Sequence, residues 1–220
     1  MKNMVPFKIW VLVMGLFLAV NLPADAQNSF GLKAGGNLSY LGPTFDEEYG
    51  ERVGYTLGAT GHIELLPSFY FIPEVNYTRR AFKFFTPAFL DNTLADTDLF
   101  LGLNYLDIPL NLGYGAFMQE EDGPDMFLLF YGGPQFNFLL SQNNRFRTST
   151  GNNNATVDLD EFDNIRSTDV GFNLGFSVGY NQWLFDLRYY FAFTSLFEFD
   201  IDADRMTSVS IGLSYRFISR

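Results

Sequence analysis

Cysteine is absent from the 220-residue chain, and histidine occurs once, as His62. A fold without cysteine has no disulfides to stabilise it, even in an exported protein. Basic residues are also scarce, since 14 Lys and Arg stand against 25 Asp and Glu, and the net charge is −11. No cluster of five or more basic residues is present. Because nucleic-acid binding needs such clusters to contact phosphates, the sequence excludes nucleic acid as a partner.

The N-terminal end has the pattern of a cleaved secretory signal peptide. Lys2 and Lys8 precede or flank the start of an apolar run over residues 9–20, and a small-x-small cleavage site follows that run. A membrane anchor is the alternative, but this run is shorter than the roughly 20 residues that span a bilayer. We therefore predict a signal peptide over residues 1–26 and one domain over residues 27–220.

Beyond this segment no run of 18 apolar residues occurs, so the mature chain has no candidate transmembrane helix. Aromatic residues are abundant instead, at 18% of the chain with 26 Phe and 12 Tyr. In "DVGFNLGFSVGY", residues 169–180, glycines four apart would suit the packing of transmembrane helices. Large apolar residues nevertheless fill every second position of this segment. A period of two indicates a β-strand whose two faces meet different surroundings.

The same alternation recurs and predicts eight strands near residues 29–40, 53–65, 69–82, 99–114, 127–140, 168–180, 183–194 and 205–217. Each strand is long enough to cross a bilayer at a tilt, whereas the strands of a soluble β-sandwich are usually shorter. One face carries large apolar residues and the other carries Gly, Ser, Asn, Thr and ions. Because this inverts the plan of a soluble protein, we predict an all-β fold, an eight-stranded antiparallel up-and-down transmembrane β-barrel.

The gaps between the predicted strands alternate in length, except that the gap at 115–126 is longer than the turn expected there. Tight turns are expected at 66–68 and 181–182, and long loops at 41–52, 83–98, 141–167 and 195–204. Outer-membrane barrels have short periplasmic turns and long external loops. The pattern therefore predicts that both ends of the barrel lie on the periplasmic side, with aromatic residues at that interface at Tyr114, Tyr180, Trp183 and Tyr215.

Charged residues of both signs fall on the inward face of the predicted strands. The set consists of Lys33, Glu64, Glu74, Asp107, Asp186, Arg188 and Arg216. Eight strands enclose an interior that side chains just fill, and buried charges are tolerated only when they are paired. We therefore predict a structural ion network that closes the lumen. A proton or ion relay is the alternative interpretation.

No catalytic site or cofactor is predicted. The single histidine, His62, shares the inward face with Glu64, but a nucleophilic site also needs a serine within reach of the histidine. His62 is expected near the periplasmic end, whereas a barrel active site is expected at the outer rim. A hydrogen-bonded histidine in the lumen is therefore favoured over a catalytic one.

Acidic residues in the expected external loops raise the question of a metal site. The segments 158–163 and 198–204 offer carboxylates, which hard cations such as calcium take as ligands. The spacing departs from a calcium-binding loop, so a solvated acidic rim is favoured and no metal site is predicted. Arg145 and Arg147, in a long polar segment, are candidates to contact lipopolysaccharide phosphates.

Five segments, in this order, carry a resemblance to a known family: "FGLKAGGNLSYL", "FIPEVNYTRR", "YLDIPLNLGY", "FYGGPQFNFLL" and "SIGLSYRF". Together they resemble the porin-like or PorT-like outer-membrane β-barrels of Gram-negative bacteria. The resemblance implies a monomeric barrel that is placed in the outer membrane by the barrel-insertion machinery, among outer-membrane lipid and lipopolysaccharide. It does not imply a single activity.

Three functions remain open from the sequence. The first is a non-enzymatic integral barrel that supports the membrane or binds surface partners through its external loops. The second is a small-solute porin, and the third is an accessory barrel subunit of a protein secretion system.

Overall fold

The computed structural model describes residues 29–41, 49–90, 93–118, 126–150, 153–159, 165–197 and 205–218. Their strands are β1 (Ser29–Leu41), β2 (Tyr49–Leu66), β3 (Phe69–Leu90), β4 (Thr93–Met118), β5 (Met126–Thr150), β6 (Asn153–Leu159), β7 (Thr168–Tyr180), β8 (Trp183–Ser195) and β9 (Arg205–Ile218). No helix among these residues is long and apolar enough to cross a membrane. The predicted signal peptide, residues 1–26, lies outside the described residues.

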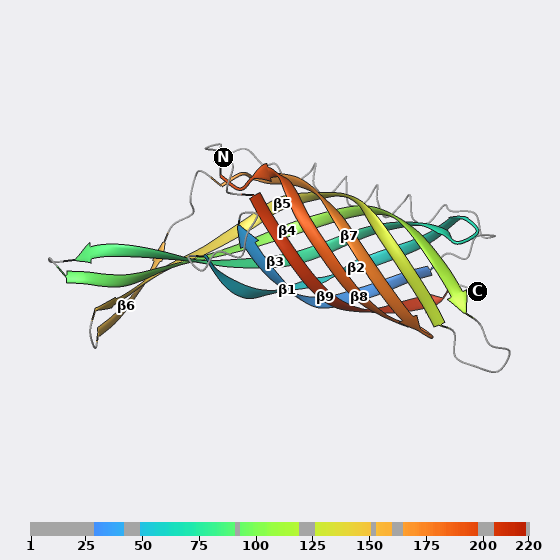
Figure 1. The fold of residues 1–220 in the computed structure, drawn as a ribbon, viewed down its shortest axis with the longest axis horizontal. Coiled ribbons are helices and arrows are strands. Elements are labelled where there is room, and N and C mark those ends of the chain that lie inside the picture. The colour runs from blue at the N-terminus through green and yellow to red at the C-terminus, as the bar shows by residue number, and fades with distance from the viewer. Residues whose placement is uncertain are drawn as a thin grey trace, which may run out of the picture.

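All strands except β6 form one closed antiparallel barrel (Figure 1). Neighbouring strands pair in chain order from β1 to β5, then β5 pairs with β7, and the sheet continues through β8 to β9. The first and last strands close it, in a register that runs from Ser29↔Ile218 to Leu41↔Met206. The predicted eight-stranded antiparallel barrel is thus confirmed. Closure leaves no row of unpaired backbone groups facing hydrocarbon.

The segment 169–180, which fits the period of a helix and of a strand, lies in strand β7. Its inward Asn173 is fully buried, while the next residue, Leu174, is 53% exposed on the outer surface. Two of its glycines make room for large side chains from other strands. A Cβ atom on Gly175 would overlap the ring of Tyr131, and one on Gly171 would meet the ring of Tyr190. The small residues of β7 therefore allow aromatic rings to fill the lumen.

One end of the barrel carries the tight turns. Ser68 and Asn181, one in each turn, have φ angles of 69° and 53°, in the left-handed region that tight turns use. The first residue of β1 and the last of β9 pair at this same end. Aromatic contacts surround it, with ring centroids 5.2 Å apart for Phe69–Tyr114 and 5.0 Å apart for Trp183–Tyr215. Tyr180 pairs with Trp183 in the register of β7 and β8. This is the end that the sequence predicts to face the periplasm, because outer-membrane barrels have short turns on that side.

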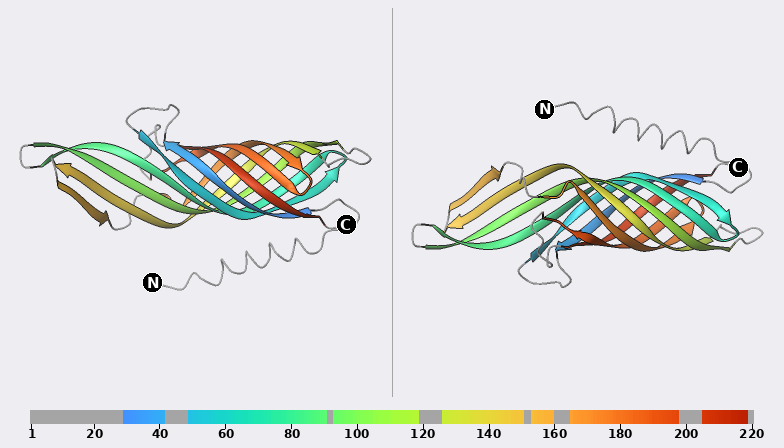
Figure 2. Two further views of the ribbon diagram at one scale, coloured as in Figure 1. Left: turned by 90° about the horizontal axis from the view of Figure 1, so that it is seen from below. Right: turned by 90° about the horizontal axis from the view of Figure 1, so that it is seen from above.

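At the opposite end, strands continue beyond the barrel as an extended sheet (Figure 2). The β3–β4 pairing reaches Leu90↔Thr93, and β5 pairs with β6 up to Thr150↔Asn153. The prediction of loops over 83–98 and 141–167 is therefore wrong in part, because much of both segments is strand. That prediction relied on an alternation imposed by lipid on one face and the lumen on the other. A sheet outside the membrane has no such constraint, so its strands need not show the alternation of apolar and polar residues from which strands were predicted.

Candidate functional site: the lumen of the barrel

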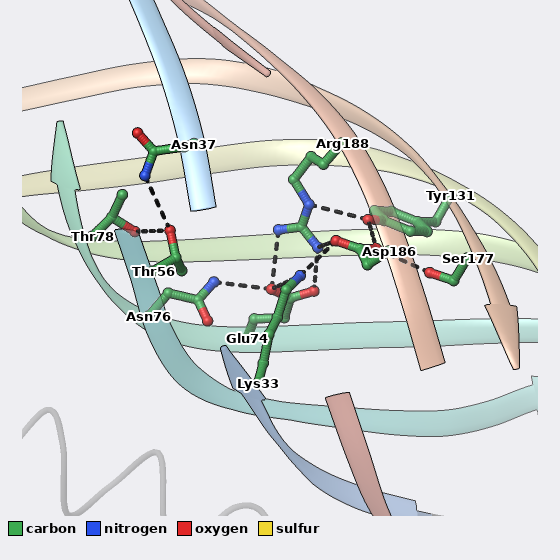
Figure 3. Close-up of polar contacts among 10 residues, drawn as sticks. All are labelled: Lys33, Asn37, Thr56, Glu74, Asn76, Thr78, Tyr131, Ser177, Asp186 and Arg188. Carbon is green, nitrogen blue, oxygen red and sulfur yellow. Dashed lines mark hydrogen bonds and ion pairs between the residues drawn. The ribbon is translucent and has the colours of Figure 1, made fainter. Parts of the chain in front are cut away.

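The lumen contains a central ion cluster, which we define as Lys33, Glu74, Asp186 and Arg188 (Figure 3). Each side chain points inward because it occupies the buried position of the alternating pattern in β1, β3 or β8. Arg188 donates two hydrogen bonds to the Glu74 carboxylate, at 2.5 Å from Nη2 and 3.0 Å from Nη1. Lys33 Nζ lies 2.8 Å from Asp186 Oδ1 and 3.4 Å from Glu74 Oε2. Two cations and two carboxylates therefore neutralise one another across the barrel.

Neutral polar side chains complete the hydrogen bonds of the central ion cluster. Tyr131 donates its hydroxyl to Asp186 and accepts a hydrogen bond from Arg188 Nε at 3.1 Å. Ser177 Oγ donates to Asp186 Oδ2 at 2.9 Å, and Asn76 Nδ2 donates to Glu74 Oε2 at 2.9 Å. Charges taken out of water are stable only when such partners replace the lost hydration. The cluster meets that condition through contacts from β1, β3, β5, β7 and β8.

A second ion cluster, which we call the outer ion cluster, contains Arg80, Asp107 and Asp169 and lies further from the turn end. In it Arg80 donates two hydrogen bonds to Asp107, at 2.8 Å and 3.3 Å. The guanidinium also lies over the rings of Tyr105 and Tyr190, 4.9 Å and 5.3 Å from their centroids. Tyr190 in turn donates to the carboxylate of Asp169 at 2.6 Å. Charged and aromatic groups thus alternate across this level of the lumen.

Sequence reasoning missed Arg80 and Asp169 as lumen residues. The alternation could have predicted both positions, because Arg80 lies an even number of residues from Glu74 in β3 and Asp169 lies an even number from Gly171 in β7. Each therefore points to the same face of the sheet as that residue. Tyr131 was missed as well, since an aromatic residue in a barrel strand was expected to face lipid.

Two apolar layers bound the ion clusters. Towards the turn end lies an inner apolar layer, formed by Tyr70, Ile72, Phe127, Leu129, Tyr131 and Leu184. Towards the other end lies an outer apolar layer, whose buried members include Phe82, Leu101, Leu103, Ile165 and Met206. Between the ion clusters is a cavity of about 30 Å³, lined in part by Lys33, Arg80, Asp107 and Arg188. A polar space of this size has room for water.

Two predicted network residues lie apart from the central ion cluster. Glu64 is partly exposed near the turn after β2. Arg216 is buried near the same end, where its Nη2 donates to the Asn181 carbonyl at 2.9 Å and its guanidinium lies 5.3 Å from the Phe127 ring centroid. The remaining predicted residues divide between the two clusters, with Asp107 in the outer one. The structure therefore brings together most of the predicted set, at two levels of the lumen.

His62 is buried near the turn end, where it pairs with Ser29 in the β1–β2 register. Its Nδ1 atom has no hydrogen-bond partner within the described part of the chain. No group of three His, Asp or Glu residues in the described segments has an arrangement that could hold a metal ion. The acidic candidates for calcium, at 158–163 and 198–204, lie outside the residues whose side chains are described.

One protein family and several solved structures are similar to this chain. The model of a family described as outer membrane protein beta-barrel domain matches residues 25–198. Among solved structures, Ail, the attachment invasion locus protein of Yersinia pestis, is 13% identical, with a TM-score of 0.38 over 86% of this chain and 97% of that one. Neisserial surface protein A is 14% identical, with a TM-score of 0.39 over 87% and 97%. The N-terminal barrel of Pseudomonas aeruginosa OprF is 8% identical, with a TM-score of 0.36 over 88% and 100%. No curated protein sequence matches this chain.

The family match covers most of the chain, from the end of the predicted signal peptide to the end of β8. It agrees with a closed barrel that has apolar side chains on its outer surface and charged side chains within. The chain therefore belongs to the outer membrane protein beta-barrel domain family and is a barrel of the outer membrane.

Proposed function

We propose that the protein is a non-enzymatic integral barrel of the outer membrane, with a lumen closed by its own side chains and external strands that support membrane integrity or bind partners. Residues 1–26 direct its export as a cleaved signal peptide, and the barrel-insertion machinery places the monomer in the membrane. The seven predicted lumen ions are structural in this proposal and carry no substrate or proton.

The observation that carries the proposal is the pair of hydrogen bonds that Arg188 donates to Glu74, together with the contacts of Lys33 to Glu74 and Asp186. These groups come from opposite sides of the sheet order and meet in the lumen, where a conducting barrel would have water. Apolar layers on both sides of the ion clusters support the same conclusion, because hydrated ions do not cross a dry, packed layer at low cost. A small-solute porin is correspondingly less well supported.

The absence of catalysis is supported by the surroundings of the one histidine. Nucleophilic catalysis needs a base in contact with a nucleophile and oriented by a third group. His62 Nδ1 lacks a hydrogen-bond partner in the described part of the chain, and Glu64 is partly exposed. His62 also lies at the turn end, away from the external strands.

The external sheet supports a role in contacts outside the membrane. Strands β3, β4 and β5 carry ordered backbone pairing well past the barrel, and β6 extends the sheet by one strand. A barrel whose only role was to support the membrane would not need this extension. The third possibility, an accessory subunit of a secretion system, would use the same surface, and co-purification after mild detergent extraction separates it from a free barrel.

Purified full-length protein in planar bilayers tests the closed lumen. We expect no steady conductance, together with faster gel migration of unheated samples, because closed barrels resist detergent at room temperature. Steady conductance from protein that shows this heat-dependent migration would overturn the closed lumen. It would also assign the lumen charges to ion selectivity.

A further inference from the structure

The cavity between the two ion clusters has a wall in which positive charge predominates. Its lining includes the cations Lys33, Arg80 and Arg188 and, of the carboxylates that the structure describes, only Asp107. The carboxylates of the central ion cluster contact the same cations from outside this lining. Asp107 is already held by Arg80 through both of its oxygen atoms. Such an excess of positive charge around a small enclosed space attracts an anion.

The three cations also have hydrogen-bond donors that their ion pairs leave unused. A lysine ammonium carries three N–H donors, and an arginine guanidinium carries five. In the described part of the chain, Lys33 uses two of its donors on carboxylates, and Arg188 uses three, on Glu74 and Tyr131. Arg80 uses two, and its Nε atom has no partner among the same residues although the side chain is buried. Several donors therefore remain for a ligand in the cavity.

An anion suits this wall better than a water molecule does. Water accepts hydrogen bonds but also brings two donors, and these need acceptors. Among the lining atoms of the described residues, Asn76 Oδ1 is a buried acceptor without a partner. A Cβ atom on Gly58 would lie 2.0 Å from this oxygen, so the oxygen points towards the β2 wall. An ion that only accepts hydrogen bonds therefore matches the unused donors, and the surrounding cations offset the cost of its burial.

The size of the cavity limits the anion to a single small ion. Its volume of about 30 Å³ is close to the space that one water molecule takes in the liquid. Chloride is only slightly larger than water, whereas phosphate, sulfate and carboxylic acids are too large to enter. The lining also holds the hydroxyl groups of Ser210, Thr56 and Thr78, and the two threonines lie to one side of Arg188 (Figure 3). The cavity therefore suits a halide ion surrounded by polar groups.

We propose that this space, which we call the anion cavity, binds a chloride ion through Lys33, Arg80, Arg188 and Ser210. The ion contacts cations of both the central and the outer ion cluster, so it joins the two levels of the lumen. It is enclosed when the barrel folds, because an ion crosses the apolar layers on either side only at high cost. The site goes beyond the proposed function and does not require it. Only the slow release of the ion rests on the closed lumen.

Bromide replaces chloride in the test, because its anomalous X-ray scattering identifies it in a crystal. Full-length protein refolded and crystallised in sodium bromide should show an anomalous peak in the anion cavity, in contact with Lys33 and Arg188. Ser210 lies between Asn37 and Arg188 in the register, and Ser210→Val should abolish the peak, because the larger side chain fills the space. Ser214→Val is the matched control, since Ser214 is a buried serine of the same strand that does not line the cavity.

Stability in solution provides a second readout, which the wild type alone can give. A ligand that binds only the folded state raises the free energy of unfolding as its concentration rises. The barrel in detergent micelles should therefore unfold at a higher urea concentration in sodium chloride than in sodium gluconate of equal ionic strength, because gluconate is too large for the cavity. The difference should disappear in Ser210→Val and persist in Ser214→Val.

Several outcomes would overturn the site. A wild-type lumen that holds ordered water and gives no anomalous peak would do so, as would an equal peak in Ser210→Val or equal stability in chloride and gluconate. Peaks confined to the outer surface would show adventitious halide binding only. Loss of bromide when the refolded protein is dialysed, with the crystal peak intact, would keep the site and contradict the closed lumen. Steady conductance would contradict the closed lumen in the same way and leave the crystal result standing.

Discussion

Arg188 and Glu74 lie 114 residues apart in the sequence and meet in the lumen through two hydrogen bonds, 2.5 Å and 3.0 Å long. One partner comes from β8 and the other from β3, strands that are not neighbours in the sheet. The contact therefore crosses the barrel interior and joins its walls. Lys33, from β1, joins Glu74 to Asp186 and makes the contact part of a four-residue cluster.

Removal of one member of the pair should strongly destabilise the barrel. Glu74→Ala or Arg188→Ala leaves a buried charge without its main partner, at a cost of about 3–5 kcal/mol, less where lumen water reaches the site. The double variant should recover part of that loss, since no charge is then left alone. The free energy of unfolding, measured by urea titration in lipid vesicles, gives the coupling between the two residues.

Asp107 provides the control for this double-mutant cycle, in which the two single variants are compared with the double variant, because its carboxylate pairs with Arg80 in the outer ion cluster. The losses in free energy of unfolding for Asp107→Ala and Arg188→Ala should be closer to additive in their double variant than the losses for Glu74→Ala and Arg188→Ala. Full additivity in the Glu74–Arg188 cycle would show that the two side chains do not stabilise each other.

A methyl group added at Gly175 should disturb the same cluster from β7. The Cβ atom of Gly175→Ala would overlap the Tyr131 ring, and Tyr131 bonds to Asp186 and Arg188. Overpacking of this kind costs about 1–3 kcal/mol. Gly36→Ala is the control, because the nearest atom to a Cβ there is 3.8 Å away. Equal stability of both variants in vesicles would mean that Tyr131 moves aside freely.

Much of the barrel could be predicted from the sequence, because lipid outside and a polar lumen inside impose a period of two on each strand. β7, β8 and β9 agree with their predicted ranges to within a residue. The extensions of β3, β4 and β5 could not be found in this way, since neither face of that sheet meets lipid.

The inward direction of Lys33, Glu74 and Arg188 followed from the same alternation, but their pairing did not. Which inward residues meet depends on strand tilt and on register shifts, such as those between Arg52 and Tyr55 and between Asn104 and Tyr105. A shift moves every later contact along the barrel axis. The sequence therefore indicated which charges face inward without indicating their level, so the position of Arg216 near the turn end could not be predicted.

A charge on the lipid face tests membrane residence directly. Phe176 faces outward in β7 and contacts Phe130 of β5, with ring centroids 4.7 Å apart. Phe176→Arg should lower the free energy of unfolding by about 2–4 kcal/mol if the position is near the bilayer midplane. Phe176→Leu, which keeps an apolar side chain, should cost much less. Equal effects of the two substitutions on vesicle-inserted protein would mean that this face does not meet hydrocarbon.

Because side chains close the lumen at several levels, we predict that ions pass only when more than one level is opened. Glu74→Ala weakens the central ion cluster but leaves the inner layer around Phe127 and the outer layer around Leu103 in place. We therefore expect this variant to remain silent in planar bilayers, as we expect for the wild type. Glu74→Ala combined with Phe127→Ala and Leu103→Ala should conduct, because each substitution opens a different level of the same path. Only preparations that keep heat-dependent gel migration are scored, so that loss of the fold is not read as an open lumen. Steady conductance from Glu74→Ala alone would show that the apolar layers do not block ions and that the central ion cluster is the sole barrier.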